Sequence, residues 1–441
     1  MTADGLPIDA PGTASSSERA GTGADAVFGA YRDHGSPGIA LAARLLGRSA
    51  YEVEADGAVV RLSDGRELID LGSYAVNLLG HRHPAVVAAC HAQLDRLPVS
   101  TRSLANAETS ALMGELAARA GAPLDRVWLG TNGSDAVEAA LKLARRGTGR
   151  PRVLAAQGGF HGKSLGALAA TANPLFRTGV ESALAPVTHL DPADAGAVAR
   201  EAAAGDVAAL VFEPIQGESG VRVLDTEVLR QWAADARAAG VFVIADEIQC
   251  GLGRCGPFSV AVDAGLEPDA VLFGKPLGGG VMPLSAMVST TGFYTPLLKD
   301  ATFHTVTFAG NPLACAAGRA ALRALAALEG EGVRIATAFE TQLGLLAEAY
   351  PQVVAGVRGR GLLWGLELQS AALAGELLLF LAEHGIVASP CLSAPTVVRL
   401  CGSLVLTDAQ LQTAFAAIGR ALAACQAVVE ADLAEEASWS S

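Results

Sequence analysis

Polar residues follow three apolar, β-rich runs in the middle of the chain, and their types could do chemistry together. Residues 213–218 (EPIQGE) follow one run, residues 246–249 (DEIQ) follow the next, and Gly274-Lys275 follows a third. In an open parallel sheet, ligands bind beyond the carboxyl ends of the strands, so these side chains are expected to meet in one cleft. The sequence therefore predicts a site in which acidic side chains lie beside a lysine.

Lys275 is the member of this set that could act as a nucleophile. Its neighbours Phe273, Pro276 and Leu277 are apolar, and desolvation lowers the pKa of a lysine, which leaves a neutral amine able to form a Schiff base. The alternative is a solvated lysine in a turn. That is the commoner situation for a single lysine, and the glycines at 278–280 would allow it.

Asp246 ends an apolar run, where an unpaired carboxylate is costly and needs a cationic or hydrogen-bonding partner. A protonated pyridine nitrogen would be such a partner. A helix cap or a structural salt bridge would also satisfy it, and the residue by itself favours these structural interpretations.

The stretch at 130–135 (GTNGSD) leads from a predicted strand into a predicted helix. Backbone N–H groups and the helix dipole would then make Gly133 and Ser134 an anion site suited to a phosphate. The alternative is structural, because Ser-Asp before a helix is also an ordinary N-cap.

A second glycine-containing loop, residues 159–164 (GFHGKS), could contact a flat ligand. Phe160 lies between glycines, where the backbone can approach a planar ring and the phenyl group can stack on it. A buried core phenylalanine is an equally good interpretation. His161 is interpreted as a local hydrogen-bonding residue rather than a catalyst.

The elements that must position these residues alternate between short β-rich runs and alanine-rich helical stretches, which is typical of parallel strands joined by crossover helices. The expected strands are Arg126–Leu129, Arg152–Ala155, Val207–Phe212, Val241–Ala245 and Ala270–Phe273. Helices are expected at Asp135–Arg146 and Thr226–Ala239, the second ending at Gly240, a suitable C-cap. The predicted fold class is therefore α/β, with a mainly parallel sheet between helices.

Two domains are expected, because 441 residues exceed what one hydrophobic core usually serves. Alternating runs around Ser63-Asp64-Gly65 predict a β-hairpin in a smaller lobe. The C-terminal region, after a helix expected at Pro312–Leu328, mixes helices with short strands and is assigned to the same lobe. The predicted parts are a disordered N-terminus (1–23), a smaller α+β domain in two pieces (24–75 and 329–441) and a large domain (76–328).

Composition excludes several other classes of protein. Hydrophobic residues make up 51% and charged residues 17%, a balance that excludes wholesale disorder. The net charge of −13, without a basic cluster, argues against a nucleic-acid partner. No uninterrupted apolar run approaches the roughly 20 residues that span a bilayer, and the N-terminus lacks the pattern of a signal peptide, so a cytoplasmic protein is expected. Seven scattered cysteines without paired ligand spacing predict free thiols and no metal site.

Taken together, these segments resemble class III (ω-amino-acid type) aminotransferases, enzymes of fold type I that use pyridoxal 5'-phosphate (PLP). The resemblance runs from about Tyr51 to Cys425. It rests on GTNGSDAVEAALKLAR (130–145), GGFHGKSLGALAAT (158–171), FEPIQGESGV (212–221), ADEIQCGLGR (245–254), FGKPLGGGVMP (273–283) and HTVTFAGNPLACAAG (304–318). Any one segment could occur by chance, but the ordered set makes the match specific.

The resemblance implies a role for each residue at the cofactor ring. Lys275 would hold PLP through a Schiff base, and Asp246 would pair with the pyridine nitrogen. Gln249 would lie near the phenolic oxygen of the ring. Phe160 and Ile248 would pack on its two faces.

The remaining roles concern the phosphate, the substrate and the subunit partner. Gly133 and Ser134 would hold the phosphate, with His161 as a further cofactor-binding residue. Thr307 would reach the phosphate from the neighbouring subunit of a homodimer whose active sites lie at the interface. Arg399 matches the arginine that binds a substrate carboxylate, a task suited to a guanidinium. Glu218 matches the acid that pairs with this arginine when the substrate has no carboxylate there.

The segments look closest to the putrescine aminotransferase branch, with ornithine and acetylornithine aminotransferases nearby. This implies ping-pong transfer of a terminal primary amino group between a diamine or ω-amino compound and 2-oxoglutarate or glutamate. The alternative is a biosynthetic aminotransferase that acts on a larger aldehyde or ketone. A decarboxylase or an aminomutase would share the same cofactor residues.

Other features depart from this interpretation. Residues 251–256 (GLGRCG) match the GxGxxG dinucleotide fingerprint of an NAD-dependent oxidoreductase, but Pro257-Phe258 follows where a helix should begin. Residues 401–404 (CGSL) replace the Pro-Pro-Leu that the family usually has after the arginine, and Asp135 stands where Glu is usual. A non-catalytic relative with the same fold is a third possibility, against which the retained Lys275, Asp246 and Arg399 argue.

Overall fold

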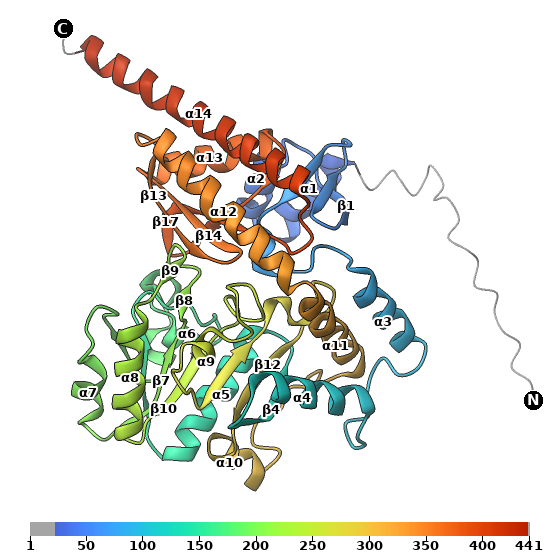
Figure 1. Ribbon diagram of the computed structural model, residues 1–441, viewed down its shortest axis with the longest axis vertical. Coiled ribbons are helices and arrows are strands. Elements are labelled where there is room, and N and C mark those ends of the chain that lie inside the picture. The colour runs from blue at the N-terminus through green and yellow to red at the C-terminus, as the bar shows by residue number, and fades with distance from the viewer. Residues whose placement is uncertain (1–22, 440–441) are drawn as a thin grey trace, which may run out of the picture. The chain divides into compact units, whose positions relative to one another are not determined.

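The computed structural model describes residues 23–439 (Figure 1). The N-terminal segment predicted to be disordered, residues 1–23, lies outside the described residues except for Gly23. The described chain divides into two compact units. One comprises residues 23–54 and 60–68, and the other comprises residues 55–59 and everything from Ile69 onward. The domain boundaries expected from the sequence stay a prediction.

The first unit contains two short helices, α1 (Ala24–His34) and α2 (Pro37–Leu46). The division between the units passes through the strands β1 (Glu52–Asp56), β2 (Val59–Leu62) and β3 (Glu67–Asp70). A tight turn joins β2 to β3, because Leu62 N–H donates to Arg66 O at 2.8 Å. Gly65 has a φ of +88° in this turn, so the predicted hairpin is confirmed, with a glycine where the backbone is left-handed.

The second unit is built around a seven-stranded sheet with the strand order β4-β12-β11-β10-β7-β5-β6. Its strands are β4 (Leu124–Gly130), β5 (Arg152–Ala156), β6 (Val187–Leu190), β7 (Val207–Phe212), β10 (Phe242–Asp246), β11 (Ala270–Phe273) and β12 (Ser285–Thr290). β10 pairs in parallel with both β7 and β11, whereas β12 is antiparallel to β11 and β4. The predicted α/β class and mainly parallel sheet are confirmed, and β6 and β12 are additional strands.

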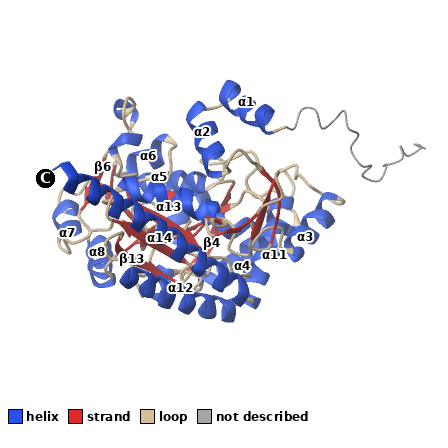
Figure 2. Ribbon diagram, turned by 90° about the horizontal axis from the view of Figure 1, so that it is seen from above, coloured by secondary structure: helices blue, strands red, loops and turns tan. Residues whose placement is uncertain are grey.

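Both faces of this sheet are buried under helices, as Figure 2 shows. Alternate residues of β7 illustrate the two faces: Ala209 and Val211 pack with α5 (Gly133–Thr148), and Leu210 and Phe212 belong to the cluster on the other face. That other cluster includes α4 (Ala107–Ala120), α7 (Ala197–Ala202), α8 (Thr226–Ala238) and α11 (Pro312–Ala327). The strands read as continuous apolar runs because neither face meets water.

The C-terminal part of this unit has a second sheet with the order β13-β14-β17-β16. Its elements are α12 (Glu329–Ala349), β13 (Val354–Arg360), β14 (Leu363–Leu368), α13 (Ala371–Glu383), β15 (Ile386–Val387), β16 (Ser389–Cys391), β17 (Ala394–Cys401) and α14 (Asp408–Trp439). Smaller elements include α3 (Pro84–Leu94), α6 (Leu165–Ala170), β8 (Ile215–Gln216), β9 (Arg222–Val223), α9 (Val260–Asp263) and α10 (Thr291–Lys299).

The stretch Asp408–Ala431 of α14 is long and apolar enough to cross a membrane by length and composition, with a mean hydropathy of 1.4. Arg420 and Glu430 interrupt its apolar residues, so it contains no uninterrupted apolar run of the kind that predicts a membrane span from sequence. Its buried residues recur at helical spacing, as at Leu411, Ala414, Ile418 and Leu422, and belong to the main hydrophobic cluster. The apolar character of this helix is therefore explained by one face packed in the core.

Candidate active site

A cavity of about 230 Å³ lies at the carboxyl ends of β7, β10 and β11. All the predicted site residues except Arg399 and Thr307 line it, namely Gly133, Ser134, Phe160, His161, Glu218, Asp246, Ile248, Gln249 and Lys275. Asn132, Gly162 and Glu213 complete the lining. The acids and the lysine predicted to converge at the strand ends therefore do so.

Lys275 follows β11 and Gly274 and begins the 3₁₀ turn η5 (Lys275–Gly278). Its backbone has a φ of +32°, which is unusual for a residue with a side chain and costs energy that the surrounding structure must supply. Burial lowers the pKa of its amine, an effect that the nearby carboxylates oppose only in part. Nζ makes no hydrogen bond with any residue in the described range 23–439. Lys275 thus faces the cavity without a hydrogen-bond partner among the described residues, and the pKa of its amine is lower than usual.

Asp246 is the last residue of β10 and is only 3% exposed. Its Oδ2 lies 2.7 Å from His161 Nδ1, and its Oδ1 accepts the backbone N–H of Ile248 at 3.2 Å. Burial alone would lower the pKa of His161, but the hydrogen bond and charge of Asp246 raise it. The histidine is therefore a hydrogen-bonding partner of the carboxylate, as its sequence context suggested.

Glu213 was not singled out from the sequence, although it follows β7 just as the DEIQ segment follows its own strand. It is 5% exposed, and its Oε1 accepts the backbone N–H of Phe160 at 2.7 Å. Its Oε2 accepts the N–H of Gly217 at 3.4 Å. Burial raises the pKa of this carboxyl to about 7. Glu213 thus ties the loop of Phe160 to the loop that carries Glu218.

Arg399 is fully buried on β17 and lies directly behind the cavity lining. Its NH1 group donates to Glu218 Oε1 and, at 3.3 Å, to Gln249 Oε1. Gln249 Nε2 donates to the same Glu218 oxygen at 3.4 Å. The Nε and NH2 groups of Arg399 have no hydrogen-bond partner within residues 23–439. The unusual residues 401–404 do not displace the arginine, because β17 continues through Cys401.

The N-terminus of α5 opens on the same cavity. Asn132, not Ser134, is its N-cap, and it forms a capping box with Asp135. Asp135 Oδ2 accepts hydrogen bonds from the Thr131 hydroxyl at 2.5 Å and from the Thr131 N–H at 2.9 Å. The aspartate that replaces the usual glutamate therefore has hydrogen-bond partners within the loop. The N–H groups at Gly133 and Ser134 remain at the positive end of the helix, where an anion is favoured.

Glycines let the backbone approach Ile248 closely on one side of this cavity. A Cβ added at Gly133 would lie 3.0 Å from Ile248 Cδ1, and one added at Gly274 would lie 3.1 Å from Ile248 Cγ2. Phe160 supplies an aromatic ring to the same lining. An amine without a partner, a buried carboxylate, a helix N-terminus and two apolar side chains therefore fit a planar aldehyde that carries a phosphate.

Thr307 lies in the loop between α10 and α11 and does not line this cavity. It lines a different cavity of about 740 Å³, together with Arg102 and Phe308. The sequence resemblance assigned Thr307 to the site of a neighbouring subunit, and its position outside the cavity of its own chain is compatible with that prediction.

The glycine run at 251–256 does not have the setting of a dinucleotide site. Turns follow β10, and the next helix is the four-residue α9, Val260–Asp263. A dinucleotide fingerprint needs a helix whose N-terminus begins at the glycines. The oxidoreductase interpretation therefore lacks its structural context.

The fold and the chemistry at the strand ends define the class of protein. The chain has the fold of PLP-dependent transferases of fold type I. Residues 47–422 match the family model described as aminotransferase class-III. The chain therefore belongs to the class-III aminotransferases, whose members use PLP.

Named relatives of this chain are also aminotransferases. It is 37% identical over 366 residues to the putrescine aminotransferase of Pectobacterium atrosepticum, covering 79% of this chain and 77% of that protein. It is 39% identical to the acetylornithine aminotransferase of Mycobacterium bovis, covering 88% and 92%. The crystal structure of the ornithine aminotransferase from Toxoplasma gondii superposes with a TM-score of 0.80 at 31% identity, covering 86% of this chain and 91% of that one.

Proposed function

We propose that this enzyme moves a terminal primary amino group between a diamine or ω-amino compound and 2-oxoglutarate or glutamate by a ping-pong mechanism. The names of its relatives support this substrate class, because putrescine, ornithine and acetylornithine are all amines or amino acids of this kind. The observation that carries the proposal is the buried pair of Glu218 and Arg399 beside the cavity of Lys275.

This pair can present two different faces to a substrate. While Glu218 neutralises Arg399, the site favours a neutral or cationic end of a substrate such as a diamine. If Glu218 turns away, the guanidinium and its unpaired Nε and NH2 groups can bind a carboxylate in a bidentate manner. The same site could therefore accept an amine in one half-reaction and a dicarboxylic keto acid in the other.

Lys275 and Asp246 would carry the chemistry. PLP, when bound, supplies an electron sink for the carbon that loses a proton. We assign Lys275 Nζ to hold the aldehyde and then to accept and return this proton, a task that a lowered pKa favours. The Asp246 carboxylate would keep a proton on the ring nitrogen. Gly133 and Ser134 would hold the phosphate, and Gln249 would donate to the ring oxygen.

We further propose a cytoplasmic homodimer in which Thr307 of each chain completes the phosphate site of the other. All seven cysteines are free and buried, which suits a reducing compartment. The exposed, unpaired side chain of Thr307 supports a role outside its own chain.

A substrate panel tests the proposed substrate class. Purified enzyme should transfer nitrogen to 2-oxoglutarate from diamines and ω-amino acids, and far more slowly from simple α-amino acids. Exclusive reaction with α-amino acids would refute the proposal, and reaction only with larger amines would favour the biosynthetic alternative.

The variant Glu218→Gln tests the switch within that panel. It removes the charge that competes for Arg399, so the KM for 2-oxoglutarate should fall while the KM for a diamine rises, each by roughly tenfold. Glu227→Gln is the matched control, since Glu227 also pairs with an arginine, Arg230, but lies outside the cavity lining. Equal changes in both KM values would show that Glu218 does not select between substrates.

A further inference from the structure

The loop that carries Thr307 has no helix or strand, yet side chains hold most of its backbone. Between residues 303 and 310, the carbonyl oxygens that accept a side-chain hydrogen bond are those of Phe303, His304, Val306, Thr307, Phe308 and Gly310. Irregular surface loops usually leave such carbonyls to water. This loop is therefore fixed in one shape by the body of its own chain.

The donors come from elements that are far apart in the sequence. They are Lys142 Nζ of α5 to Phe303 O at 2.7 Å, Trp128 Nε1 of β4 to His304 O at 3.3 Å, Thr109 Oγ of α4 to Gly310 O at 2.6 Å, and Asn311 Nδ2 to Phe308 O at 3.0 Å. Asn311 is also the N-cap of α11. Both ends of the loop are thus attached to the sheet and its helices.

Arg102 holds the centre of the loop. Its NH1 group donates to the consecutive carbonyls of Val306 and Thr307, the second at 3.0 Å. Arg102 has a φ of +61°, a conformation that costs energy at a non-glycine residue and often marks a functional position. Its own N–H donates to Ser100 Oγ at 3.0 Å, which helps to fix this backbone. Among the side chains of residues 23–439, only the Arg102 guanidinium donates a hydrogen bond to the backbone of Thr307.

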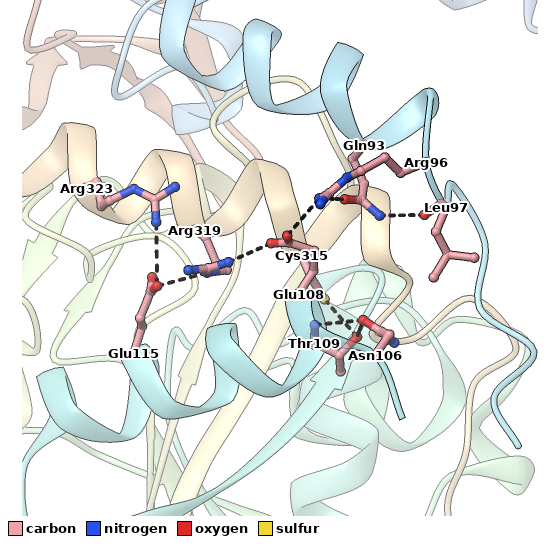
Figure 3. A network of polar contacts seen from close by, with 10 residues as sticks. All are labelled: Gln93, Arg96, Leu97, Asn106, Glu108, Thr109, Glu115, Cys315, Arg319 and Arg323. Atoms are coloured by element: carbon pink, nitrogen blue, oxygen red, sulfur yellow. Dashed lines mark hydrogen bonds and ion pairs between the residues drawn. The ribbon is translucent and has the colours of Figure 1, made fainter. Parts of the chain in front are cut away.

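Figure 3 shows the support beneath the Thr109 anchor. Thr109 Oγ lies 2.9 Å from Asn106 Oδ1, the N-cap of α4, and Cys315 Sγ lies 3.7 Å from the same hydroxyl. Beside it, Glu108 pairs with Arg319 of α11 at 2.7 Å. Ion pairs and hydrogen bonds therefore join α4 to α11 where the loop ends.

What this framework leaves free is the side chain of Thr307. It is exposed, and its hydroxyl makes no hydrogen bond with any residue between 23 and 439. The neighbouring Phe308 is 58% exposed, which is unusual for an aromatic side chain on a rigid loop. A fixed loop that exposes an unpaired hydroxyl and an apolar ring is suited to contact another molecule.

We propose that Arg102 is a positioning residue for the active site of the partner subunit in the homodimer. It clamps the loop so that Thr307 of one chain can donate to the cofactor phosphate held by a second copy of the chain. Arg102 itself touches neither substrate nor cofactor. The inference rests on the shared-site homodimer of the proposed function and adds to it the device that presents the shared residue.

Arg102→Ala should weaken PLP binding roughly tenfold, the effect of loosening one hydrogen-bonded contact. PLP binding is measured by titration of the apoenzyme, a readout separate from turnover. Arg102→Lys, which keeps a cationic donor, should recover part of the loss. Arg230→Ala is the matched control, because Arg230 is another arginine that donates to a backbone carbonyl, Ala264 O, but on α8. Unchanged PLP affinity in Arg102→Ala would overturn the proposal.

A heterodimer shows in which subunit Arg102 acts. Lys275→Ala and Arg102→Ala chains carrying different tags are co-expressed and purified through both tags. If Arg102 acts across the interface, the site with an intact Lys275 receives an intact loop from the other chain. The heterodimer should then have one native site of two, with about half the wild-type activity. Activity no higher than half that of the Arg102→Ala homodimer would place the defect within one chain and overturn the proposal.

A second heterodimer, of Lys275→Ala with Thr307→Val, tests separately whether the two subunits share their active sites through Thr307. If it recovers about half the wild-type activity while the Arg102→Ala pair does not, only the role of Arg102 is wrong. If neither pair recovers, the shared-site homodimer itself fails, and the role of Arg102 fails with it.

Discussion

Asp246 and Glu247 are consecutive buried carboxylates at the end of one strand, and they have opposite surroundings. Glu247 is fully buried and accepts hydrogen bonds from Ser259 Oγ at 2.6 Å, Val260 N at 2.7 Å and Ala261 N at 2.8 Å. It therefore holds the start of α9. Asp246 has one donor on each oxygen, His161 Nδ1 at 2.7 Å and the N–H of Ile248 at 3.2 Å, and it lines the cavity.

The difference between these neighbours shows how to distinguish a carboxylate that stabilises the fold from one that serves a ligand site. Successive side chains on a strand point to opposite faces, so one residue serves the core and the next serves the cavity. A buried carboxylate with a full set of donors is satisfied and has no need of a ligand. A charge with fewer partners is where a ligand can supply another: Asp246 has one donor on each oxygen, Lys275 Nζ has no partner among the described residues, and two nitrogen groups of Arg399 have none.

The largest effect on catalysis is expected at Lys275, which faces the cavity without a hydrogen-bond partner among the described residues. Lys275→Ala should lower kcat by at least about 10³-fold, because it removes both the group that holds the cofactor and the proton carrier. The melting temperature should not fall, since an amine without a hydrogen-bond partner adds little stability. Lys299→Ala on the exposed end of α10 is the control. Turnover within tenfold of the wild type would contradict the assignment.

A smaller loss, on the order of 10²-fold in kcat, is expected for Asp246→Asn. The variant keeps the shape but removes the charge that faces the cavity. Because Asp246 raises the pKa of His161, the pKa of the histidine should fall in the variant, which NMR can follow. A normal kcat together with an unchanged histidine would show that Asp246 belongs with Glu247 as a scaffold residue.

Much of the fold could be predicted because the sheet is buried on both faces. Val207–Phe212 is apolar throughout, and the predicted and observed strands coincide. β12 was missed because Ser285 and Ser289 interrupt its apolar pattern, and its β structure depends on pairing with β4 and β11. β6 was missed because it is a short edge strand of half-exposed residues.

The site residues that lie directly after strands could be found from the sequence, since their position alone implies a shared edge. Arg399 could not, because it comes from a different sheet and reaches Glu218 across 181 positions of sequence. It was identified only through family resemblance. Both partners of Glu213 and two of the three partners of Glu247 are backbone N–H groups, which carry no side-chain signal, so only the structure distinguishes these acids from Asp246.

The smallest effect on catalysis is expected at Glu247, the carboxylate whose hydrogen bonds are all made within the protein core. Glu247→Gln should leave kcat within a few-fold of the wild type, because the side chain faces α9 and does not line the cavity. Its effect should appear in stability instead. Burial raises the pKa of this carboxyl from 4.5 to about 7.

A carboxyl whose pKa is raised on folding binds its proton more tightly in the native state, so its contribution is complete below the unfolded pKa of 4.5 and is lost as the pH rises through about 7. Glutamine cannot lose a proton, so the melting temperature of Glu247→Gln should fall less than that of the wild type between about pH 5 and pH 8, by a few degrees. Other titrating groups cancel in the difference between the two curves. Parallel curves would mean that Glu247 keeps the same charge state throughout, and a loss of activity at constant stability would place it in the site beside Asp246.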